Sequence, residues 1–280
     1  MPAPRPAHLE PSELGTKEYW DKLYATELAN HESNPKDTGT VWFDDADAEA
    51  KMVQFLAELD DEGNLNARTI LDLGCGNGSL LRAVRDEIFA DGVPDGDTEV
   101  KLLGVDYSEA SVSLARSVVG EVADAEAGAG AGADGLPISF AVWDMLQGSA
   151  SELVQDGQAA ACWDLVLDKG TFDAISLGNT TRDNDDGGAD GSPSVEVQYR
   201  AQVLNLLRPG GRFLITSCNW TETELCAWME DEEERERAAQ NGGAWLVKAG
   251  RVAYPSFQFG GVQGQTVCTV CFEKRVAPVS

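Results

Sequence analysis

The stretch from residue 69 to residue 78 constrains this chain more than any other. It reads Thr-Ile-Leu-Asp-Leu-Gly-Cys-Gly-Asn-Gly, an apolar run that ends in an acid and then in glycines at alternate positions. The apolar run is typical of a buried parallel strand. The glycines allow a tight turn and the close approach of a ligand. Because residues 79–88 follow with apolar side chains at helical spacing, the stretch predicts the ligand-binding corner of a doubly wound α/β sheet.

The spacing of the glycines indicates which ligand binds there. A dinucleotide-binding turn reads G-x-G-x-x-G, whereas this chain has G-x-G-x-G preceded by Asp72. A carboxylate at the base of the turn suits an amino or cationic group, which disfavours an NAD-dependent dehydrogenase. The motif Asp72-Leu-Gly-Cys-Gly-Asn-Gly resembles the first motif of class I S-adenosylmethionine-dependent methyltransferases. A glycine-rich turn of some other α/β protein is the alternative.

Strands and helices alternate along the rest of the chain, which favours a mostly parallel sheet. We expect strands at residues 69–73, 100–106, 138–143, 163–167 and 212–217. Ser108 is expected to cap the helix after the second strand, and Thr221-Glu-Thr-Glu224 forms a capping box that opens the last helix. Residues 245–252 and 267–272 predict a closing antiparallel pair of strands with no helix between them.

The pattern predicts a single domain over residues 13–280 behind a proline-rich, disordered segment at residues 1–12. Within it, residues 13–60 are expected to form a helical cover over the ligand site, although plain packing explains their aromatic side chains equally well. Segments near residues 91–98, 123–135 and 179–193 are rich in Gly, Ala, Asp or Asn and are expected to be flexible insertions.

The net charge restricts the possible partners. The chain has 21 Lys and Arg against 48 Asp and Glu, a formal charge of −27, which argues against nucleic acid binding. It favours a basic protein partner, with solubility alone as an equal alternative. The first residues lack the apolar core expected of a signal peptide, no apolar run reaches the length of a membrane helix, and the six scattered cysteines suit a reducing cytoplasm. Cys268 and Cys271 are expected to be core residues, and His8 and His31 make no metal site.

Acids stand at or near the ends of four predicted strands: Asp72, Asp106, Asp144 and Asp168. The carboxyl ends of parallel strands share one edge, above which the ligand binds. Asp106 is placed to accept both ribose hydroxyls, or alternatively to cap the next helix. Asp144 could accept the adenine amino group, and Met145 could pack on the ring or lie in the core. Asp72 and the backbone around Gly74 would hold the amino-acid end of the cofactor.

Several further motifs make the chain resemble one particular family, the protein-lysine methyltransferases that act on translation elongation factor 1-alpha. They are Glu13-Leu-Gly-Thr-Lys-Glu-Tyr-Trp-Asp, Val41-Trp-Phe, Gly104-Val-Asp-Tyr-Ser, Asp168-Lys-Gly-Thr-Phe-Asp-Ala-Ile-Ser-Leu, Thr216-Ser-Cys-Asn-Trp-Thr and Phe257-Gln-Phe-Gly-Gly. The resemblance covers roughly residues 13–275. It implies a cytoplasmic, monomeric enzyme with a Rossmann-like seven-stranded methyltransferase fold, S-adenosylmethionine as cofactor and elongation factor 1-alpha as partner.

The resemblance also implies a set of site residues. The cofactor-binding residues would be Trp20, Trp42, Asp72, Gly74, Cys75, Gly76, Gly78, Asp106, Tyr107, Ser108, Asp144, Met145 and Asp168, and the catalytic residues Asp168, Asp173, Asn219 and Trp220. Asp168 is expected beside the reactive methyl group. Asn219 and Trp220 would line the lysine channel or merely form a structured loop.

The implied reaction is in-line attack of a neutral lysine amine on the sulfonium methyl group. Deprotonating a free lysine at neutral pH costs about 4 to 5 kcal/mol, since its pKa is about 10.4. A nearby carboxylate would stabilise the ammonium, so Asp168 or Asp173 is assigned to orienting the lysine and not to a base role. A methyltransferase for small molecules and a non-catalytic adaptor with this fold are the remaining alternatives.

Overall fold

We analysed a computed structural model of the chain. It describes residues 5–90, 92, 100–120, 136–154, 163–178, 193–255, 257–259, 262–264 and 266–277. The insertions expected near residues 91–98, 123–135 and 179–193 lie outside this part of the chain, except for Gly92 and Pro193. None of the described helices is long and apolar enough to cross a membrane.

A seven-stranded mixed sheet forms the centre of the fold, in the order β3-β2-β1-β4-β5-β9-β6. Its strands are β1 (Thr69–Leu73), β2 (Lys101–Asp106), β3 (Ile138–Val142), β4 (Trp163–Lys169), β5 (Leu207–Ser217), β6 (Ala244–Val252) and β9 (Cys268–Val276). The pairs β1–β2, β2–β3 and β4–β5 are parallel, whereas β9 is antiparallel to β5 and β6. The predicted fold class, a Rossmann-like, mostly parallel seven-stranded sheet with antiparallel strands at the C-terminus, is confirmed.

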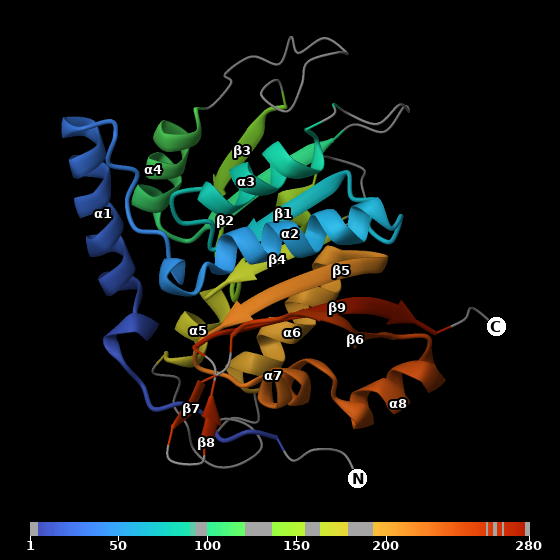
Figure 1. Ribbon diagram of the computed structural model, residues 1–280. Helices are drawn as coiled ribbons and strands as arrows, with labels where there is room; N and C mark the ends of the chain where they lie inside the picture. Colours follow the sequence, from blue (N-terminus) through green and yellow to red (C-terminus); the bar gives the residue numbers. More distant parts are fainter. Residues whose placement is uncertain are drawn as a thin grey trace. The chain divides into compact units, whose positions relative to one another are not determined.

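The helices are numbered in chain order in Figure 1. They are α1 (Lys17–Ser33), α2 (Ala48–Asp61), α3 (Ser79–Ile88), α4 (Glu109–Val119), α5 (Thr171–Ser176), α6 (Val195–Leu206), α7 (Glu222–Met229) and α8 (Glu232–Asn241). Three short 3-10 helices, η1 (Glu13–Gly15), η2 (Asp44–Ala46) and η4 (Ala150–Leu153), lie between them.

The chain divides into two compact units. One consists of residues 17–144, here called the glycine unit, and the other of residues 1–16 and 145–280, here called the C-terminal unit. Each is described by itself. The expected single domain over residues 13–280 stays a prediction. Of the first segment, expected to be disordered, residues 5–12 are described and contact the C-terminal unit.

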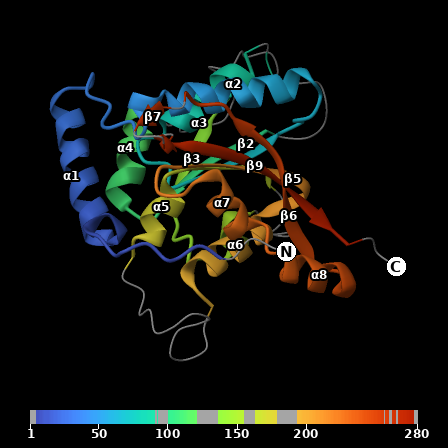
Figure 2. The ribbon, with the colours of Figure 1, turned by 60° about the horizontal axis from the view of Figure 1, so that its bottom comes forward.

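The glycine unit consists of three parallel strands and the helices next to them. Residues Ile70 to Leu73 of β1 are all buried, as expected for a strand covered on both faces. Helix α3 buries Leu80, Leu81 and Val84, so the helical spacing predicted for residues 79–88 is confirmed. Helix α1 lies alongside α4, as Figures 1 and 2 both show. The segment before the first strand therefore packs on the helix that follows Asp106.

The C-terminal unit has an aromatic core formed by Trp163, Tyr199, Phe213 and Phe272, which are all buried. Strand β9 lies between β5 and β6, so the closing antiparallel pair predicted from the sequence is confirmed. The pair is not a simple hairpin, because β7 (Phe257–Phe259) and β8 (Val262–Gly264) form a separate small hairpin in the connection. Cys268 and Cys271 are free and buried, as expected of core residues.

One helix of this unit does not follow from apolar periodicity. The sequence of α8, Glu-Glu-Glu-Arg-Glu-Arg-Ala-Ala-Gln-Asn, has no apolar face. Its ends are nevertheless marked, because the Asp231 side chain accepts a hydrogen bond from the Glu234 N–H at 2.9 Å and Gly242 adopts a left-handed conformation. The capping box predicted at Thr221 opens α7 and is confirmed, but α7 is not the last helix.

Candidate active site

The turn after β1 requires glycine for two separate reasons. Gly74, Gly76 and Gly78 have φ angles of 64°, 54° and 76°, in the left-handed region that other residues avoid. A Cβ atom on Gly76 would also lie 2.9 Å from the Tyr24 hydroxyl oxygen. The Cys75 N–H donates to the Val105 carbonyl at 2.9 Å and fastens the turn to β2. The glycines thus hold an open backbone loop between two parallel strands.

The carboxylate of Asp106 at the end of β2 lies against this turn. Its Oδ2 accepts hydrogen bonds from the Ser111 hydroxyl at 2.7 Å and the Gly76 N–H at 3.3 Å, and its Oδ1 accepts one from the Ser108 N–H at 2.9 Å. Asp106 is 5% exposed, and burial raises the pKa of its carboxyl, while these hydrogen bonds and Lys17 lower it in part. An acceptor site remains on Oδ1, since a carboxylate oxygen can accept two hydrogen bonds.

One expectation about this strand end is wrong. Ser108 occupies the N-cap position of α4 with extended backbone, but its side chain makes no capping hydrogen bond. Its hydroxyl is buried. Asp106 binds the Ser108 N–H instead, because a strand-end carboxylate two residues earlier reaches the same backbone group. Asp106 therefore binds the start of α4 and still has an acceptor site for a ligand, so the two predicted roles do not exclude each other.

Helix α1 covers the turn through its aromatic side chains. The Trp20 ring packs on the rings of Trp42 at 5.2 Å and Tyr24 at 6.1 Å between centroids. Lys17 lies 5.0 Å above the ring of Tyr107. Trp20, Trp42 and Tyr107 are half-buried, so each retains a partly open face.

Tyr24 is the site residue that the sequence analysis missed. It is 6% exposed, and within the described part of the chain its hydroxyl makes no hydrogen bond. Burial, followed by the nearby carboxylate of Asp106, raises the pKa of the phenol far above its usual value. The signal was the spacing of four residues that places Trp20 and Tyr24 on one side of the helix. A buried phenol pointing at Gly76 without a partner marks a place prepared for a ligand oxygen or nitrogen.

The other predicted residues of this unit lie near the same strand ends. Asp72, 2% exposed, pairs across the sheet with Gly104, two residues before Asp106. Cys75 is buried between them, and burial raises its thiol pKa, with further contributions from Asp106 and Asp72. Asp144 is half-buried, and its charge raises the pKa of Tyr107, to which burial is the main contributor. The strand register thus brings together the acids predicted from residues 72, 106 and 144.

In the C-terminal unit, Asp168 lies within β4 and is completely buried. Its Oδ1 accepts a hydrogen bond from the Thr171 N–H at 2.9 Å, and its Oδ2 accepts from the Phe172 N–H at 3.0 Å and the Tyr199 hydroxyl. Burial raises the pKa of Asp168 to about 7, which the hydrogen bond from Tyr199 partly opposes. The carboxyl group therefore binds the first turn of α5 and the core residue Tyr199.

Asp173 on α5 connects to the loop that follows β5. It is 5% exposed and accepts hydrogen bonds from the Ser217 hydroxyl and, at 2.8 Å, from the Cys218 N–H. Burial raises its pKa. Asn219, the next residue along this loop, is exposed. Trp220 is 4% exposed and packs on Phe172 at 6.2 Å between ring centroids. Of the four predicted catalytic residues, only Asn219 is exposed.

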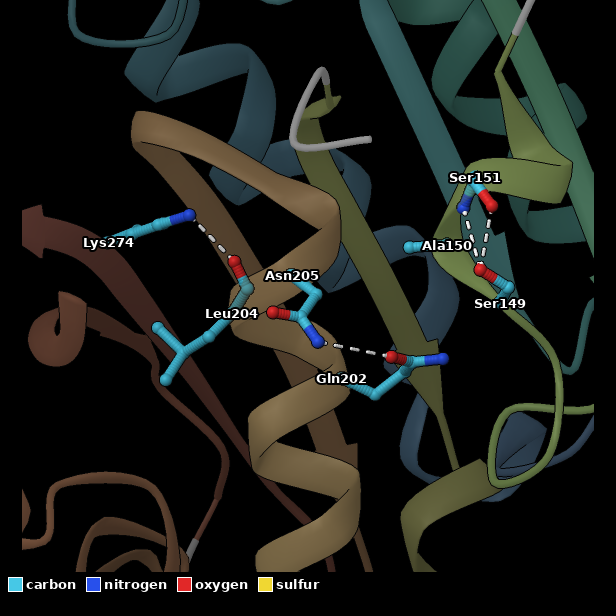
Figure 3. A pocket seen from close by; sticks show the side chains of 7 residues that line it. All are labelled: Ser149, Ala150, Ser151, Gln202, Leu204, Asn205 and Lys274. Carbon is cyan, nitrogen blue, oxygen red and sulfur yellow. Dashed lines mark hydrogen bonds between the residues drawn. The ribbon is translucent and has the colours of Figure 1, made fainter. Parts of the chain in front are cut away.

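Met145 is the first residue of the longer segment of this unit and is buried, at 7% exposure. A cavity of about 430 Å³ lies elsewhere in the unit, between η4, α6 and β9 (Figure 3). Its lining residues are Ser149, Ala150, Ser151, Gln202, Leu204, Asn205 and Lys274. Lys274 donates to the carbonyls of Leu204 and Leu207, both at 2.7 Å, and so completes the C-terminal end of α6. None of the residues predicted from the sequence lines this cavity.

The glycine unit fits S-adenosylmethionine by the chemistry of its groups. Carboxylates at Asp72 and Asp106 suit an amino group and ribose hydroxyls, Gly74 of the glycine turn is exposed, and the Tyr24 hydroxyl lacks a partner within the described residues. Half-buried aromatic rings suit a planar base or a cation.

Comparisons with known proteins agree with this fit. Residues 65–261 match a family model described as a methyltransferase domain. The chain is 40% identical to protein-lysine N-methyltransferase EFM4 of Saccharomyces cerevisiae, over 96% of this chain and 98% of that protein. It is 34% identical to efm4 of Schizosaccharomyces pombe over 95% of each chain, and 31% identical to EEF1A lysine methyltransferase 2 of Danio rerio over 94% of this chain and 89% of that protein.

These similarities extend over nearly the whole chain and confirm the family resemblance seen in its motifs. They favour the enzyme over the non-catalytic adaptor and over the methyltransferase for small molecules. The chain therefore belongs to the family of S-adenosylmethionine-dependent protein-lysine N-methyltransferases that includes EFM4 and EEF1A lysine methyltransferase 2.

Proposed function

We propose that this enzyme methylates a lysine of translation elongation factor 1-alpha. The observation that carries the proposal is the 40% identity to EFM4 across 96% of the chain. The name of the Danio rerio relative gives EEF1A as the protein whose lysine that relative methylates. The formal charge of −27 supports a basic protein partner and disfavours nucleic acid as a substrate.

In this proposal the glycine unit holds the cofactor, which supplies a methyl group on a positively charged sulfur when bound. Asp106 accepts hydrogen bonds from the ribose hydroxyls through the free acceptor site on Oδ1. Asp72 and the backbone of the glycine turn bind the amino-acid end, and Asp144 accepts from the adenine amino group. Trp20, Trp42 and Tyr107 pack on the cofactor, and the Tyr24 hydroxyl donates a further hydrogen bond.

The C-terminal unit orients the lysine in this proposal. Both oxygens of Asp173 already accept hydrogen bonds from the loop after β5, and Asp168 is completely buried. Such groups are poor candidates for a base that takes the lysine proton. Their contacts support a role in fixing the loop with Asn219 and Trp220, which receives the amine. Accurate positioning of this kind supplies up to about 7 to 11 kcal/mol of a reaction barrier.

The test is methylation of purified elongation factor 1-alpha by the purified enzyme with S-adenosylmethionine, read by mass spectrometry of the intact protein and its peptides. We expect the mass to rise by one or more methyl groups on a single lysine. The Asp106→Asn variant, at the same concentration, should give little product. Labelling of other lysate proteins with an unmodified elongation factor would contradict the proposed substrate.

We propose further that the enzyme works as a cytoplasmic monomer without a membrane partner. The scattered cysteines support a reducing compartment, and the five in the described part of the chain are free. Light scattering during size-exclusion chromatography should give a mass near 29.9 kDa. A dimer mass would contradict the monomer.

A further inference from the structure

The first four residues of the longest N-terminal motif, Glu13-Leu-Gly-Thr, are part of the family resemblance but have no place in cofactor binding as described above. They end a segment, residues 5–16, which belongs to the C-terminal unit although it stands at the start of the chain. We call this segment the N-terminal strap. Its contacts show what the motif does.

One end of the strap closes on α5. The Ser12 N–H donates to the Leu177 carbonyl, one residue beyond the end of α5, at 3.1 Å. Three residues later, a Cβ atom on Gly15 would lie 2.1 Å from the Leu177 oxygen and 2.3 Å from the Gly178 nitrogen. Both obstacles are backbone atoms, which cannot move aside as the tip of a side chain can. Glycine at this position is therefore required by the close approach of the strap to α5.

The other end of the strap is anchored on α6, α7 and α8. His8 Nδ1 lies 3.0 Å from Oε1 of Glu196, a carboxylate with no exposure to solvent. The His8 ring also packs on Trp228, with 5.5 Å between ring centroids. Arg5 pairs with Asp231 at 2.8 Å. The strap thus runs from these three helices to the C-terminal end of α5, and its course is fixed at both ends.

Helix α5 depends on such external contacts because it has only six residues. A helix of this length is not stable on its own. Asp168 holds its first turn, and Asp173 ties its middle to Ser217 and Cys218. The strap holds its last turn. Loosening the strap would let the C-terminal end of α5 shift, and Asp173, which lies one turn before Leu177, would move with it together with the loop of Cys218 and Asn219.

We propose that the N-terminal strap is a positioning element for methyl transfer, in which Gly15 and Ser12 clamp α5 and thereby fix Asp173 and the Cys218–Asn219 loop. The inference rests on the proposed function of that loop in orienting the lysine. It makes no demand on cofactor affinity, since every contact of the clamp lies within the C-terminal unit. It also explains why the motif needs a small residue at position 15.

The test compares full-length Gly15→Ala with Gly63→Ala, which strains the backbone of the glycine unit at φ 70° but brings its new Cβ within 4 Å of nothing, and so controls for a loss of stability remote from the clamp. Hydrogen exchange is measured first, without substrate or cofactor. We expect peptides from residues 168–178 and 217–221 to exchange at least about tenfold faster in Gly15→Ala, with residues 101–106 unchanged. With elongation factor 1-alpha, kcat should fall about tenfold to 100-fold, because small misplacements remote from the reacting atoms have effects of this size. The Kd for S-adenosylmethionine should stay within about twofold of the parent.

A second pair of variants keeps the test independent of the folding of Gly15→Ala. His8→Ala removes the anchor on Glu196 without adding a clash, and we expect a loss in kcat of about threefold. His8→Asn retains a donor near the position of Nδ1 and should restore the parent value. A merely structural role would lower the Tm of His8→Ala without changing kcat at low temperature.

The outcomes separate the strap from the proposed function. Normal exchange at Cys218 in a folded Gly15→Ala variant overturns the strap proposal, as does a loss of cofactor affinity that parallels the loss of kcat. If Asp173→Asn loses turnover while Gly15→Ala and His8→Ala keep it, only the strap proposal fails. If the parent enzyme does not methylate elongation factor 1-alpha, the proposed substrate fails, and faster exchange in Gly15→Ala still supports the clamp.

Discussion

Asp106 in the glycine unit and Asp168 in the C-terminal unit are alike in most respects. Both stand at or near the carboxyl end of a parallel strand, both are nearly or completely buried, and both accept hydrogen bonds from a following helix or loop. They differ in what surrounds them. Asp106 lies beside a glycine turn, half-buried aromatic rings and a phenol with no partner among the described residues. Asp168 lies between the first turn of α5 and Tyr199.

The difference shows that a strand-end acid does not reveal its function by position alone. A carboxylate can bind a ligand only if an acceptor site is both free and reachable. Asp106 meets this condition because its Oδ1 keeps an acceptor site and the neighbouring turn begins with the exposed residue Gly74. Asp168 has no exposed surface, so whatever acceptor capacity it retains is out of reach. In the proposed function, the same residue type therefore binds the cofactor in one unit and stabilises local structure in the other.

The pH dependence of stability is the largest effect that this contrast predicts. Burial raises the pKa of Asp168 to about 7, whereas an aspartate in an unfolded chain titrates near about 4. The folded protein therefore binds the extra proton between these pH values. The raised pKa of Asp168 adds about 4 kcal/mol to the free energy of unfolding below about pH 4. This contribution is lost as the pH rises from about 4 to about 7.

Urea unfolding of the parent and of Asp168→Asn between about pH 4 and pH 9 measures this effect. The variant is less stable throughout, because an amide cannot accept all the hydrogen bonds that Asp168 accepts. The difference between parent and variant should shrink as the pH rises and become constant above about pH 8. If the stabilities of parent and variant changed in parallel with pH, Asp168 would titrate like an ordinary exposed aspartate, and its burial would have no effect on its pKa.

Cofactor affinity is the next largest effect and concerns the other acid. Asp106→Asn should raise the Kd for S-adenosylmethionine about 100-fold, or about 3 kcal/mol, since hydrogen bonds to a charged acceptor contribute about 1.5 to 3 kcal/mol each. Calorimetric titration measures the Kd directly. Asp61→Asn, at an exposed position on α2, is the control. Unchanged affinity in Asp106→Asn would put Asp106 in the same structural class as Asp168.

A third variant tests the function of the C-terminal unit. Asp173→Asn removes one of the two oxygen acceptors that hold Ser217 and Cys218. We expect kcat to fall about 30-fold, or about 2 kcal/mol, with the Kd for S-adenosylmethionine within about twofold of the parent. Steady-state kinetics with elongation factor 1-alpha gives kcat, and calorimetry gives the Kd. A parallel loss of cofactor affinity would end the separation of functions between the units.

Much of this fold could be predicted from the sequence because its signals are local. Apolar runs and glycines predict the strand, turn and helix at residues 69–88. Thr221 and Glu224, three residues apart, predict the capping box that opens α7. Helix α8 has no apolar face, so periodicity gives no sign of it, although Asp231 and Gly242 mark its ends. Helix α5 is held in part by the hydrogen bonds of Asp173 with Ser217 and Cys218, which are long-range contacts that no local pattern contains.

The candidate site also contains residues that local signals predict and residues whose surroundings depend on long-range contacts. The ends of β1 and β2 place Asp72 and Asp106 together through strand register, which the sequence implies once the strands are assigned. The function of Asp168 depends on Tyr199, which follows 31 residues later. Tyr24 was overlooked because its hydroxyl is recognised as a candidate ligand contact only from its place beside Gly76, which follows 52 positions later in the chain. Long-range contacts of this kind decide between a core phenol and a ligand-binding phenol.

The smallest predicted effect contrasts two buried phenols, one in each unit. Tyr24 is 6% exposed and its hydroxyl has no partner within the described residues, whereas the Tyr254 hydroxyl, in a residue 8% exposed, lies 2.7 Å from the Thr269 hydroxyl. Tyr24→Phe should raise the Kd for S-adenosylmethionine about fivefold, or about 1 kcal/mol, without lowering the Tm of the free enzyme.

Tyr254→Phe should do the reverse, because its hydroxyl is used inside the protein. We expect its free energy of unfolding to fall by about 1 kcal/mol with no change in cofactor affinity. Calorimetry and thermal unfolding of both variants provide the comparison. If Tyr24→Phe instead lowers the Tm and leaves the Kd unchanged, its hydroxyl serves the packing of α1 on the glycine turn. The cover would then be a structural layer, and only the acids and the glycines would remain as the cofactor site.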